Sequence, residues 1–138
     1  MNYVSTDEQI TKNERKSINE IVAKKGWIYF RQCETKVVGQ LAGIDNAVVD
    51  TGGGVILDPI NVNVLKSLGK VVWLKAPISV LNHRIVTDTS RPPLTDKRVI
   101  DEMRIVYEQR KNLYESAANA SIDTSGKSPL DIVKEITQ

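Results

Sequence analysis

The stretch Val48-Val49-Asp50-Thr51-Gly52-Gly53-Gly54-Val55-Ile56-Leu57 is an apolar run that ends at an aspartate and leads into three consecutive glycines. Each glycine costs roughly 1 kcal/mol relative to alanine where the backbone must be ordered. A folded chain carries that cost where a turn needs a positive φ angle, or where another group approaches the backbone closely. At the end of a buried strand, such a turn lies where open α/β sheets bind ligands, although a loose glycine-rich turn gives the same pattern.

Strands and helices alternate on both sides of this stretch. β-Branched and apolar segments predict strands at residues 3–4, 47–50, 71–74 and 120–122. Helical spacing predicts helices at residues 8–14, 17–26, 27–41, 59–68, 77–85, 99–117 and 130–136, the second of them opened by a capping box of Ser17 and Glu20. Alternation of this kind predicts one α/β domain over residues 1–138, with a mostly parallel sheet and helices on both of its faces. Functional groups are then expected where the strands end, near Asp7, Asp50 and Asp123.

The bulk composition narrows the class of protein. The 138 residues are 41% hydrophobic and 26% charged, an ordinary balance for a globular domain, and the net charge is only +2 with the basic residues scattered. The single cysteine, Cys33, excludes an internal disulfide and fits a reducing compartment. No apolar run approaches the roughly 20 residues of a membrane span, and the first residues lack the apolar core of a signal peptide. We therefore expect a cytoplasmic protein with neither a nucleic-acid nor a membrane partner.

Three arginines stand in segments that suit anion binding. Arg31 and Glu34 are three residues apart on one predicted helix, Arg91 lies in the proline-stiffened loop 87–98, and Arg110 lies late in a long predicted helix. Each has an ordinary interpretation as well. Arg31 and Glu34 would form a surface ion pair, Arg91 would be an exposed loop charge, and Arg110 would lie on a solvated helix face.

Together these segments resemble shikimate kinase, in order and at the spacing of that family, over essentially the whole chain. The matching pieces are the Asp-x-Asp-type turn at Ser5-Thr6-Asp7, Phe30-Arg31-x-x-Glu34, Thr51-Gly-Gly-Gly, Val71-Val72-Trp73-Leu74, Asp88-Thr89-Ser90-Arg91-Pro92, Arg110-x-x-Leu113-Tyr114, and Asp123-Thr124 before Ser128-Pro129. Any one of these is a weak signal, whereas seven in order are specific.

The resemblance implies a fold and an activity. The fold would be the three-layer parallel α/β arrangement of P-loop kinases of the nucleoside-monophosphate-kinase type. The activity would be ATP-dependent phosphorylation of shikimate to shikimate 3-phosphate, a step of chorismate and aromatic amino-acid biosynthesis, with Mg²⁺ as the metal. The complete protein would be a monomer.

The resemblance also implies roles for the residues that would meet shikimate. Asp7 matches the acid that hydrogen-bonds the shikimate hydroxyls and assists the attacking one. Arg31 and Arg110 match the two arginines that clamp the shikimate carboxylate, which a guanidinium fork can bind with two bonds. The backbone that touches the substrate corresponds to Gly52, Gly53 and Gly54.

Further roles concern the nucleotide and the metal. Arg91 matches an arginine of a lid, residues 87–98, that closes over the ATP phosphates, and Arg84 a second basic residue near them. Residues 125–129, with Lys127, match the loop around adenine. The family places a magnesium-holding aspartate where this chain has Ser5. Because Asp50 follows an apolar strand as a Walker B aspartate does, we expect Asp50 to compensate as the magnesium ligand.

The chain departs from the family in one large respect, because no Gly-x-x-x-x-Gly-Lys-Ser/Thr motif occurs in the 138 residues. The resemblance implies a preceding strand, P-loop and helix of about 30 residues, whose strand would lie between those ending at Asp50 and Leu74. Met1 would then be internal to a longer reading frame, or the product truncated. Four interpretations stay open: a kinase active only with that unit, a P-loop-less shikimate-binding module, a non-functional fragment, and a kinase of the same fold for another small molecule.

Overall fold

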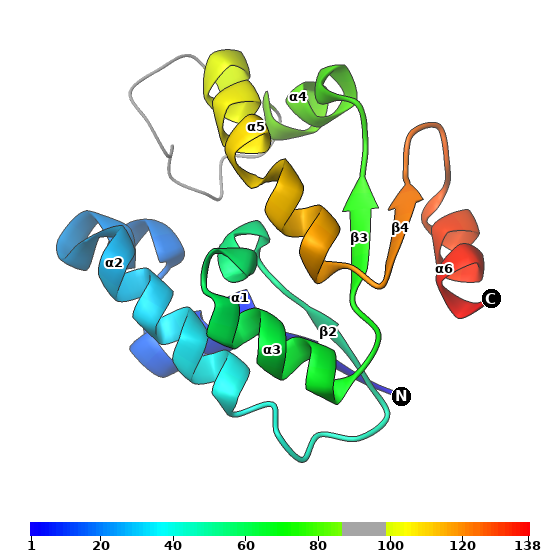
Figure 1. The fold of residues 1–138 in the computed structure, drawn as a ribbon. Helices are drawn as coiled ribbons and strands as arrows, with labels where there is room; N and C mark the ends of the chain where they lie inside the picture. The colour runs from blue at the N-terminus through cyan, green and yellow to red at the C-terminus, as the bar shows by residue number, and fades with distance from the viewer. Residues whose placement is uncertain (87–98) are drawn as a thin grey trace. The chain divides into compact units, whose positions relative to one another are not determined.

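The computed structural model describes residues 1–86 and 99–138, and its chain divides into two compact units (Figure 1). The first unit is Met1–Gly69, and the second comprises residues 70–86 and 99–138 among those described. The predicted lid, residues 87–98 with Arg91, lies outside the described residues. No helix in the described ranges is both long enough and apolar enough to cross a membrane.

The first unit is a parallel strand pair with helices. In chain order it contains β1 (Asn2–Ser5), α1 (Thr6–Glu14), α2 (Ile18–Gly39), β2 (Ala47–Asp50), the 3₁₀ helix η1 (Gly53–Leu57) and α3 (Pro59–Leu68). β1 and β2 pair in parallel, with Tyr3 opposite Val48 and Ser5 opposite Asp50. The carboxyl ends of the two strands therefore coincide, and the chain that leaves each strand starts from the same edge.

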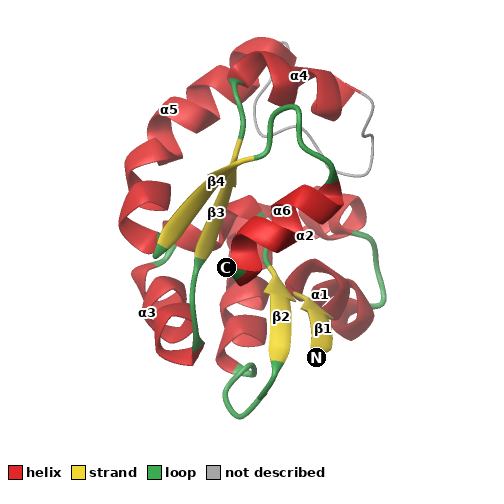
Figure 2. Cartoon of the chain, turned by 90° about the vertical axis from the view of Figure 1, so that its right-hand side faces the viewer, coloured by secondary structure: helices red, strands yellow, loops and turns green. Residues whose placement is uncertain are grey.

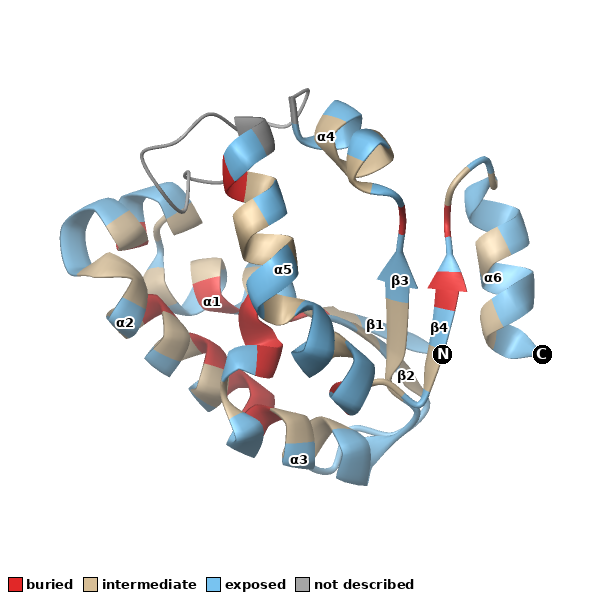
Figure 3. Cartoon of the chain, turned by 45° about the horizontal axis from the view of Figure 1, so that its top comes forward, coloured by how far each residue is buried: buried red, intermediate tan, exposed pale blue. Residues whose placement is uncertain are grey.

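The core of this unit lies between α1 and α2. Ile10, Ile21, Phe30 and Val37 are buried together there, and Figure 3 shows buried positions along both helices. The Trp27 ring packs edge-on against Phe30 with centroids 5.7 Å apart. These residues recur at helical spacing, so one apolar stripe of α2 faces α1. At the other side of the unit, the β1–β2 pair carries Tyr3 and Val48 with 62% and 51% of their surfaces exposed.

The segment labelled α2 was predicted as two helices, and a break at Gly26 divides it at the predicted position. The Ser17 hydroxyl accepts a bond from the Glu20 N–H, which confirms Ser17 as the N-cap of the predicted capping box. Gly26 has φ 83° and ψ 172°, outside the helical region, and helical geometry resumes immediately after it. Glycine adopts a positive φ without the steric cost that a Cβ would add, so the chain kinks here between the two helical stretches.

The second unit is also a parallel strand pair with helices. It contains β3 (Val72–Lys75), α4 (Ile78–Val86), α5 (Val99–Ala117), β4 (Ala120–Asp123) and α6 (Pro129–Thr137). Trp73 lies opposite Ser121 and Lys75 opposite Asp123 in the β3–β4 pair, which Figure 2 shows side by side. Helix α4 packs against α5, and α6 packs against β4. The parallel α/β architecture is thus confirmed, and its described strands form two two-stranded sheets.

Candidate functional site

The first candidate site is built where β1 and β2 end. Beyond β1, the Ser5 hydroxyl caps α1 by accepting from the Glu8 N–H at 3.3 Å, and Asp7 follows in the first turn of that helix. Beyond β2, the chain passes through the glycine turn into η1. The Thr6 hydroxyl ties the two strand ends together by donating to the Asp50 carbonyl at 3.4 Å. Asp7 and the glycine turn therefore leave the same edge of the strand pair.

The glycine turn lies against two carboxylates. A Cβ atom built on Gly52 would come within 3.1 Å of Asp7 Oδ1 and 3.4 Å of Glu34 Oε2. Both Gly52 and the Asp7 Oδ1 atom are buried. An alanine at position 52 would therefore have to push one of these carboxylates aside.

The glycine turn also lies against Arg31 of α2. A Cβ built on Gly54 would overlap the guanidinium group of Arg31. None of Gly52, Gly53 and Gly54 has a positive φ, since the glycines that do are Gly26, Gly43 and Gly126. Close approach of other groups, rather than an unusual backbone angle, is thus the reason for glycine at positions 52 and 54. Gly53 itself is exposed.

Arg31 is held in place by a buried carboxylate. Its Nη1 atom bonds Glu34 Oε1 at 2.9 Å and Oε2 at 3.2 Å, and the Glu34 side chain is only 1% exposed. The Arg31 side chain is 26% exposed, and its guanidinium carbon lies 5.4 Å from the Trp27 ring centroid and 5.3 Å from that of Phe30. Both bonds to Glu34 use Nη1, which leaves Nη2 and Nε for a ligand. The surface ion pair that the spacing allowed is thus a largely buried pair.

We expect Glu34→Gln to destabilise the first unit. The amide keeps the volume but removes the charge that offsets the desolvation of Arg31. Breaking a buried ion pair costs 3–5 kcal/mol, and the partial exposure of Arg31 reduces the expected loss to about 2 kcal/mol. Urea unfolding followed by circular dichroism measures it. Glu108→Gln, an exposed carboxylate on α5, is the control and should change the free energy of unfolding by less than about 0.5 kcal/mol. Equal stability of the two variants would contradict this account of Glu34.

Ser5 and Asp50, the two candidate magnesium ligands, lie opposite each other in the β1–β2 register. The Asp50 carboxylate is exposed and accepts a bond from the Tyr3 hydroxyl at 2.9 Å through Oδ2, and this bond raises the pKa of Tyr3. The Ser5 hydroxyl is buried and already caps α1. Within residues 1–86 and 99–138, no group of three or more His, Cys, Asp or Glu side chains could hold a metal. Mg²⁺ commonly takes one or two carboxylates and fills its other positions with water and phosphate, so Asp50 fits it better than Ser5.

A second cluster of candidate residues lies at the carboxyl ends of β3 and β4. Arg84 of α4 donates to the Thr124 hydroxyl at 3.1 Å and to its carbonyl at 3.5 Å. The Thr124 hydroxyl in turn donates to the Lys75 carbonyl at 3.1 Å. The Lys127 ammonium lies 2.7 Å from Glu135 Oε1 and 3.0 Å from Oε2. The structure therefore holds Arg84 against the strand ends, whereas Lys127 is engaged by α6.

The remaining predicted residue is Arg110, which lies half-buried on α5. The structure brings Asp7, Arg31 and the glycine turn together within the first unit, while Arg84, Arg110 and Lys127 belong to the second. That Arg31 and Arg110 bind the same ligand carboxylate stays a prediction. Glu34 is the residue that sequence reasoning did not name as part of the site, although its spacing from Arg31 was the available signal.

Two carboxyl groups of the second unit offer a matched pH measurement. The Ser125 hydroxyl and N–H lower the pKa of Asp123, and the Ser128 hydroxyl and N–H lower that of Asp131. Because both folded-state values are lowered, these bonds stabilise the fold above the ordinary value of 3.8 and are lost as the pH falls through the lowered values. In an NMR titration, Ser125→Ala should raise the pKa of Asp123 alone, and Ser128→Ala that of Asp131 alone. A rise at both carboxyls in either variant would contradict this assignment.

Comparison with solved structures identifies the class. The chain superimposes on shikimate kinase from Acinetobacter baumannii in complex with shikimate with a TM-score of 0.93 and 30% identity, covering 99% of this chain and 76% of that one. For shikimate kinase from Aquifex aeolicus the TM-score is 0.83 and the identity 33%, covering 99% and 79%. The chain therefore has the α/β fold of the P-loop kinases.

Sequence comparison identifies the family. The family model described as shikimate kinase matches residues 1–138. Shikimate kinase of Persephonella marina is 39% identical over 134 residues, which is 97% of this chain and 80% of that protein. The chain belongs to the shikimate kinase family, a family of ATP-dependent transferases that act in aromatic amino-acid biosynthesis.

Proposed function

We propose that this chain contains the shikimate site of an enzyme that transfers the γ-phosphoryl group of ATP to a shikimate hydroxyl, giving shikimate 3-phosphate. One observation carries the proposal: Asp7, Arg31 and buried Glu34 converge on a glycine turn, where a Cβ at position 52 would crowd the two carboxylates and a Cβ at position 54 would overlap the Arg31 guanidinium. A cation held beside main chain that carries no side chains suits a small ligand with both a carboxylate and hydroxyl groups. The relatives named shikimate kinase support this choice of ligand.

The residues of the first unit take different parts in this proposal. Arg31 would bind the shikimate carboxylate through the nitrogens that Glu34 leaves available, and Arg110 would hold the second carboxylate oxygen. Asp7, in the first turn of α1, would accept a hydrogen bond from the reacting hydroxyl and take its proton as the new phosphate bond forms. Gly52, Gly53 and Gly54 would present main chain to the substrate ring.

The nucleotide side of the site is distributed over other residues. ATP supplies the phosphoryl group in this family, and Mg²⁺ neutralises phosphate charge when bound. Arg84 is already fixed at the strand ends by Thr124, so it would meet phosphate with little loss of side-chain freedom. Arg91 would close over the phosphates from the 87–98 segment, and Lys127 would reach the nucleotide only by leaving Glu135. Asp50, with Ser5 as the weaker candidate, would hold the metal.

The absence of a Gly-x-x-x-x-Gly-Lys-Ser/Thr motif from the 138 residues favours a second candidate function. This would be a non-catalytic shikimate-binding module, or a fragment without function. In either case we propose one cytoplasmic domain over residues 1–138, monomeric when a P-loop unit completes it.

The carboxylate clamp can be tested from the ligand side. Calorimetry of the 138-residue chain should show shikimate binding, and shikimate methyl ester, which lacks the negative charge, should bind at least about tenfold more weakly because a charge-assisted bond contributes about 1.5–3 kcal/mol. The matched control repeats both titrations, of shikimate and of its methyl ester, with the Arg31→Met variant. In that variant the preference for the acid should fall. Equal affinity for acid and ester would overturn the proposed site.

A further inference from the structure

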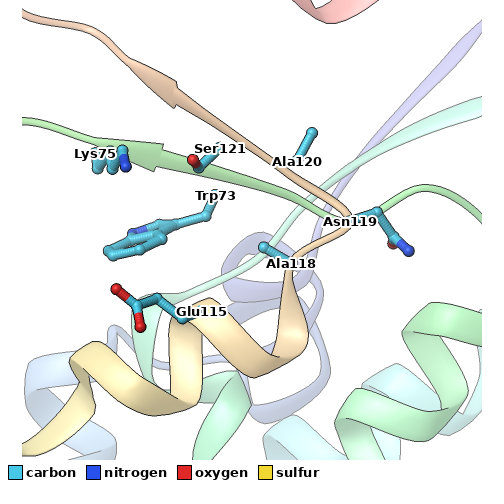
Figure 4. Close-up of a pocket in the computed structure, with 7 residues that line it drawn as sticks. All are labelled: Trp73, Lys75, Glu115, Ala118, Asn119, Ala120 and Ser121. Atoms are coloured by element: carbon cyan, nitrogen blue, oxygen red, sulfur yellow. The ribbon is translucent and has the colours of Figure 1, made fainter.

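A solvent-open cavity of about 300 Å³ lies in the second unit, and none of the residues assigned to shikimate or nucleotide lines it (Figure 4). It lies beside the β3–β4 pair and the last turn of α5, and its lining includes Trp73, Lys75, Glu115, Ala118, Asn119 and Ser121. Trp73 and Ser121 are opposite each other in the strand register, and Lys75 is the next residue on the same face of β3. Lys75, Glu115, Asn119 and Ser121 are exposed and the other lining residues are half-buried, so the cavity is open to solvent.

One wall of the cavity is a fixed aromatic surface. The Trp73 indole stacks on the Tyr114 ring with centroids 5.4 Å apart and an interplanar angle of 22°. Tyr114 is on α5, so this contact fixes the indole between the helix and the strand. Ala118 and Ala120 add small apolar groups to the same lining. A planar apolar group that lies against the indole would share it with Tyr114 and with the Lys75 ammonium.

Charges of opposite sign stand on different elements around that wall. The Lys75 ammonium lies 5.3 Å from the Trp73 ring centroid, on the strand side. Figure 4 shows the Glu115 carboxylate on the helix side, directed toward Trp73. In the described part of the chain, no ion pair engages either group. The Asn119 side-chain oxygen Oδ1 accepts a hydrogen bond from the Val71 N–H at 2.8 Å. The side-chain NH₂ group of Asn119 therefore remains as a donor.

We propose that this cavity binds a small aromatic zwitterion, a molecule with one ring, one ammonium and one carboxylate group. The ring would lie against Trp73 and Ala118, the ammonium would pair with Glu115, and the carboxylate would pair with Lys75 and accept from the Ser121 hydroxyl. Recognition requires all three parts, since a partly exposed ion pair alone contributes little. None of these residues belongs to the proposed shikimate site, so the two proposals stand or fall separately.

The test uses the chain's two tryptophans, because Trp27 is in the first unit and serves as an internal reference. L-Phenylalanine is titrated into the ¹⁵N-labelled 138-residue chain, with 3-phenylpropionate and phenethylamine as analogues that each lack one charge. The indole N–H signal of Trp73 should shift while that of Trp27 stays, and each analogue should bind about two- to fivefold more weakly, because ion pairs with exposed side chains are weak. No shift up to about 10 mM, an affinity below about 3 kcal/mol, or equal binding of all three compounds would overturn the proposal.

Variants then locate the site. Glu115→Gln should abolish the preference for L-phenylalanine over 3-phenylpropionate, and Ser121→Leu should remove binding by filling the cavity. Glu108→Gln, an exposed carboxylate on the same helix, should bind like the unmodified chain. Unchanged Trp27 and backbone amide signals in the absence of ligand show that each variant is folded. A preference retained in Glu115→Gln, or lost equally in Glu108→Gln, would place the ligand elsewhere.

Discussion

The 138-residue chain is expected to transfer no phosphate from ATP to shikimate, and joining the strand–P-loop–helix unit of a family relative before Met1 is expected to give measurable turnover. The reason is chemical. A P-loop supplies backbone N–H groups, a lysine and a magnesium-binding hydroxyl to the phosphates, and the 138 residues contain no such motif. The cations that we propose for the nucleotide, Arg84 and Lys127, are single side chains that cannot replace that cradle.

The measurement is ADP release together with mass spectrometry of the shikimate product, for the short and the joined chain. A joined chain whose P-loop lysine is replaced by methionine is the control and should be almost inactive. The joined chain should also unfold at higher urea, because a domain's total stability is only about 5–15 kcal/mol and a further strand adds core contacts. Phosphorylation by the short chain would contradict the prediction, and Gly126-Lys127-Ser128 would then be the first phosphate site to examine.

Arg31→Ala and Arg110→Ala should each weaken shikimate binding by about 2–4 kcal/mol, since each removes a charge-assisted pair from a largely desolvated site. Lys36→Ala on α2 and Lys111→Ala on α5 are matched controls, because both lysines are exposed and lie near the two arginines in sequence. Calorimetry with shikimate measures the loss, and nucleotide affinity of the joined chain should change little.

The two arginine variants also test separate claims. If Arg31→Ala keeps its affinity for shikimate, the proposed site beside Gly54 and Glu34 is wrong. Retained affinity in Arg110→Ala alone would leave that site intact and remove only the second arginine of the clamp. A loss of equal size in the lysine controls would show that net charge, rather than the clamp, controls binding.

Local patterns predicted most of the elements because their causes are local. The β-branched segment Ala47–Asp50 and the long helix Val99–Ala117 have the predicted bounds, and the Ser17 cap is present. The break at Gly26 was likewise predicted, because a glycine between two helical patterns marks the end of a helix. Which strands pair is decided by contacts distant in sequence, and no local pattern contains them.

The site was predictable in its residue types but not in its burial. The spacing of Arg31 and Glu34 is the same for a surface pair and for the buried pair that the structure contains, because burial depends on what η1 brings over α2. Likewise, the bond from Tyr3 to Asp50 joins residues 47 positions apart and follows from the strand register alone. The sequence therefore predicts candidate side chains for a ligand, and the structure adds the neighbours that orient them.

The glycine turn has a consequence for how this chain can diverge. A Cβ at position 52 would lie 3.1 Å from Asp7 Oδ1, and a Cβ at position 54 would overlap the Arg31 guanidinium. A replacement of Gly52 therefore needs a small shift of a carboxylate, whereas a replacement of Gly54 needs the Arg31 side chain to move or to become shorter. New ligand preferences at position 54 are thus expected to arise through paired changes, in which a shorter residue at position 31 appears first.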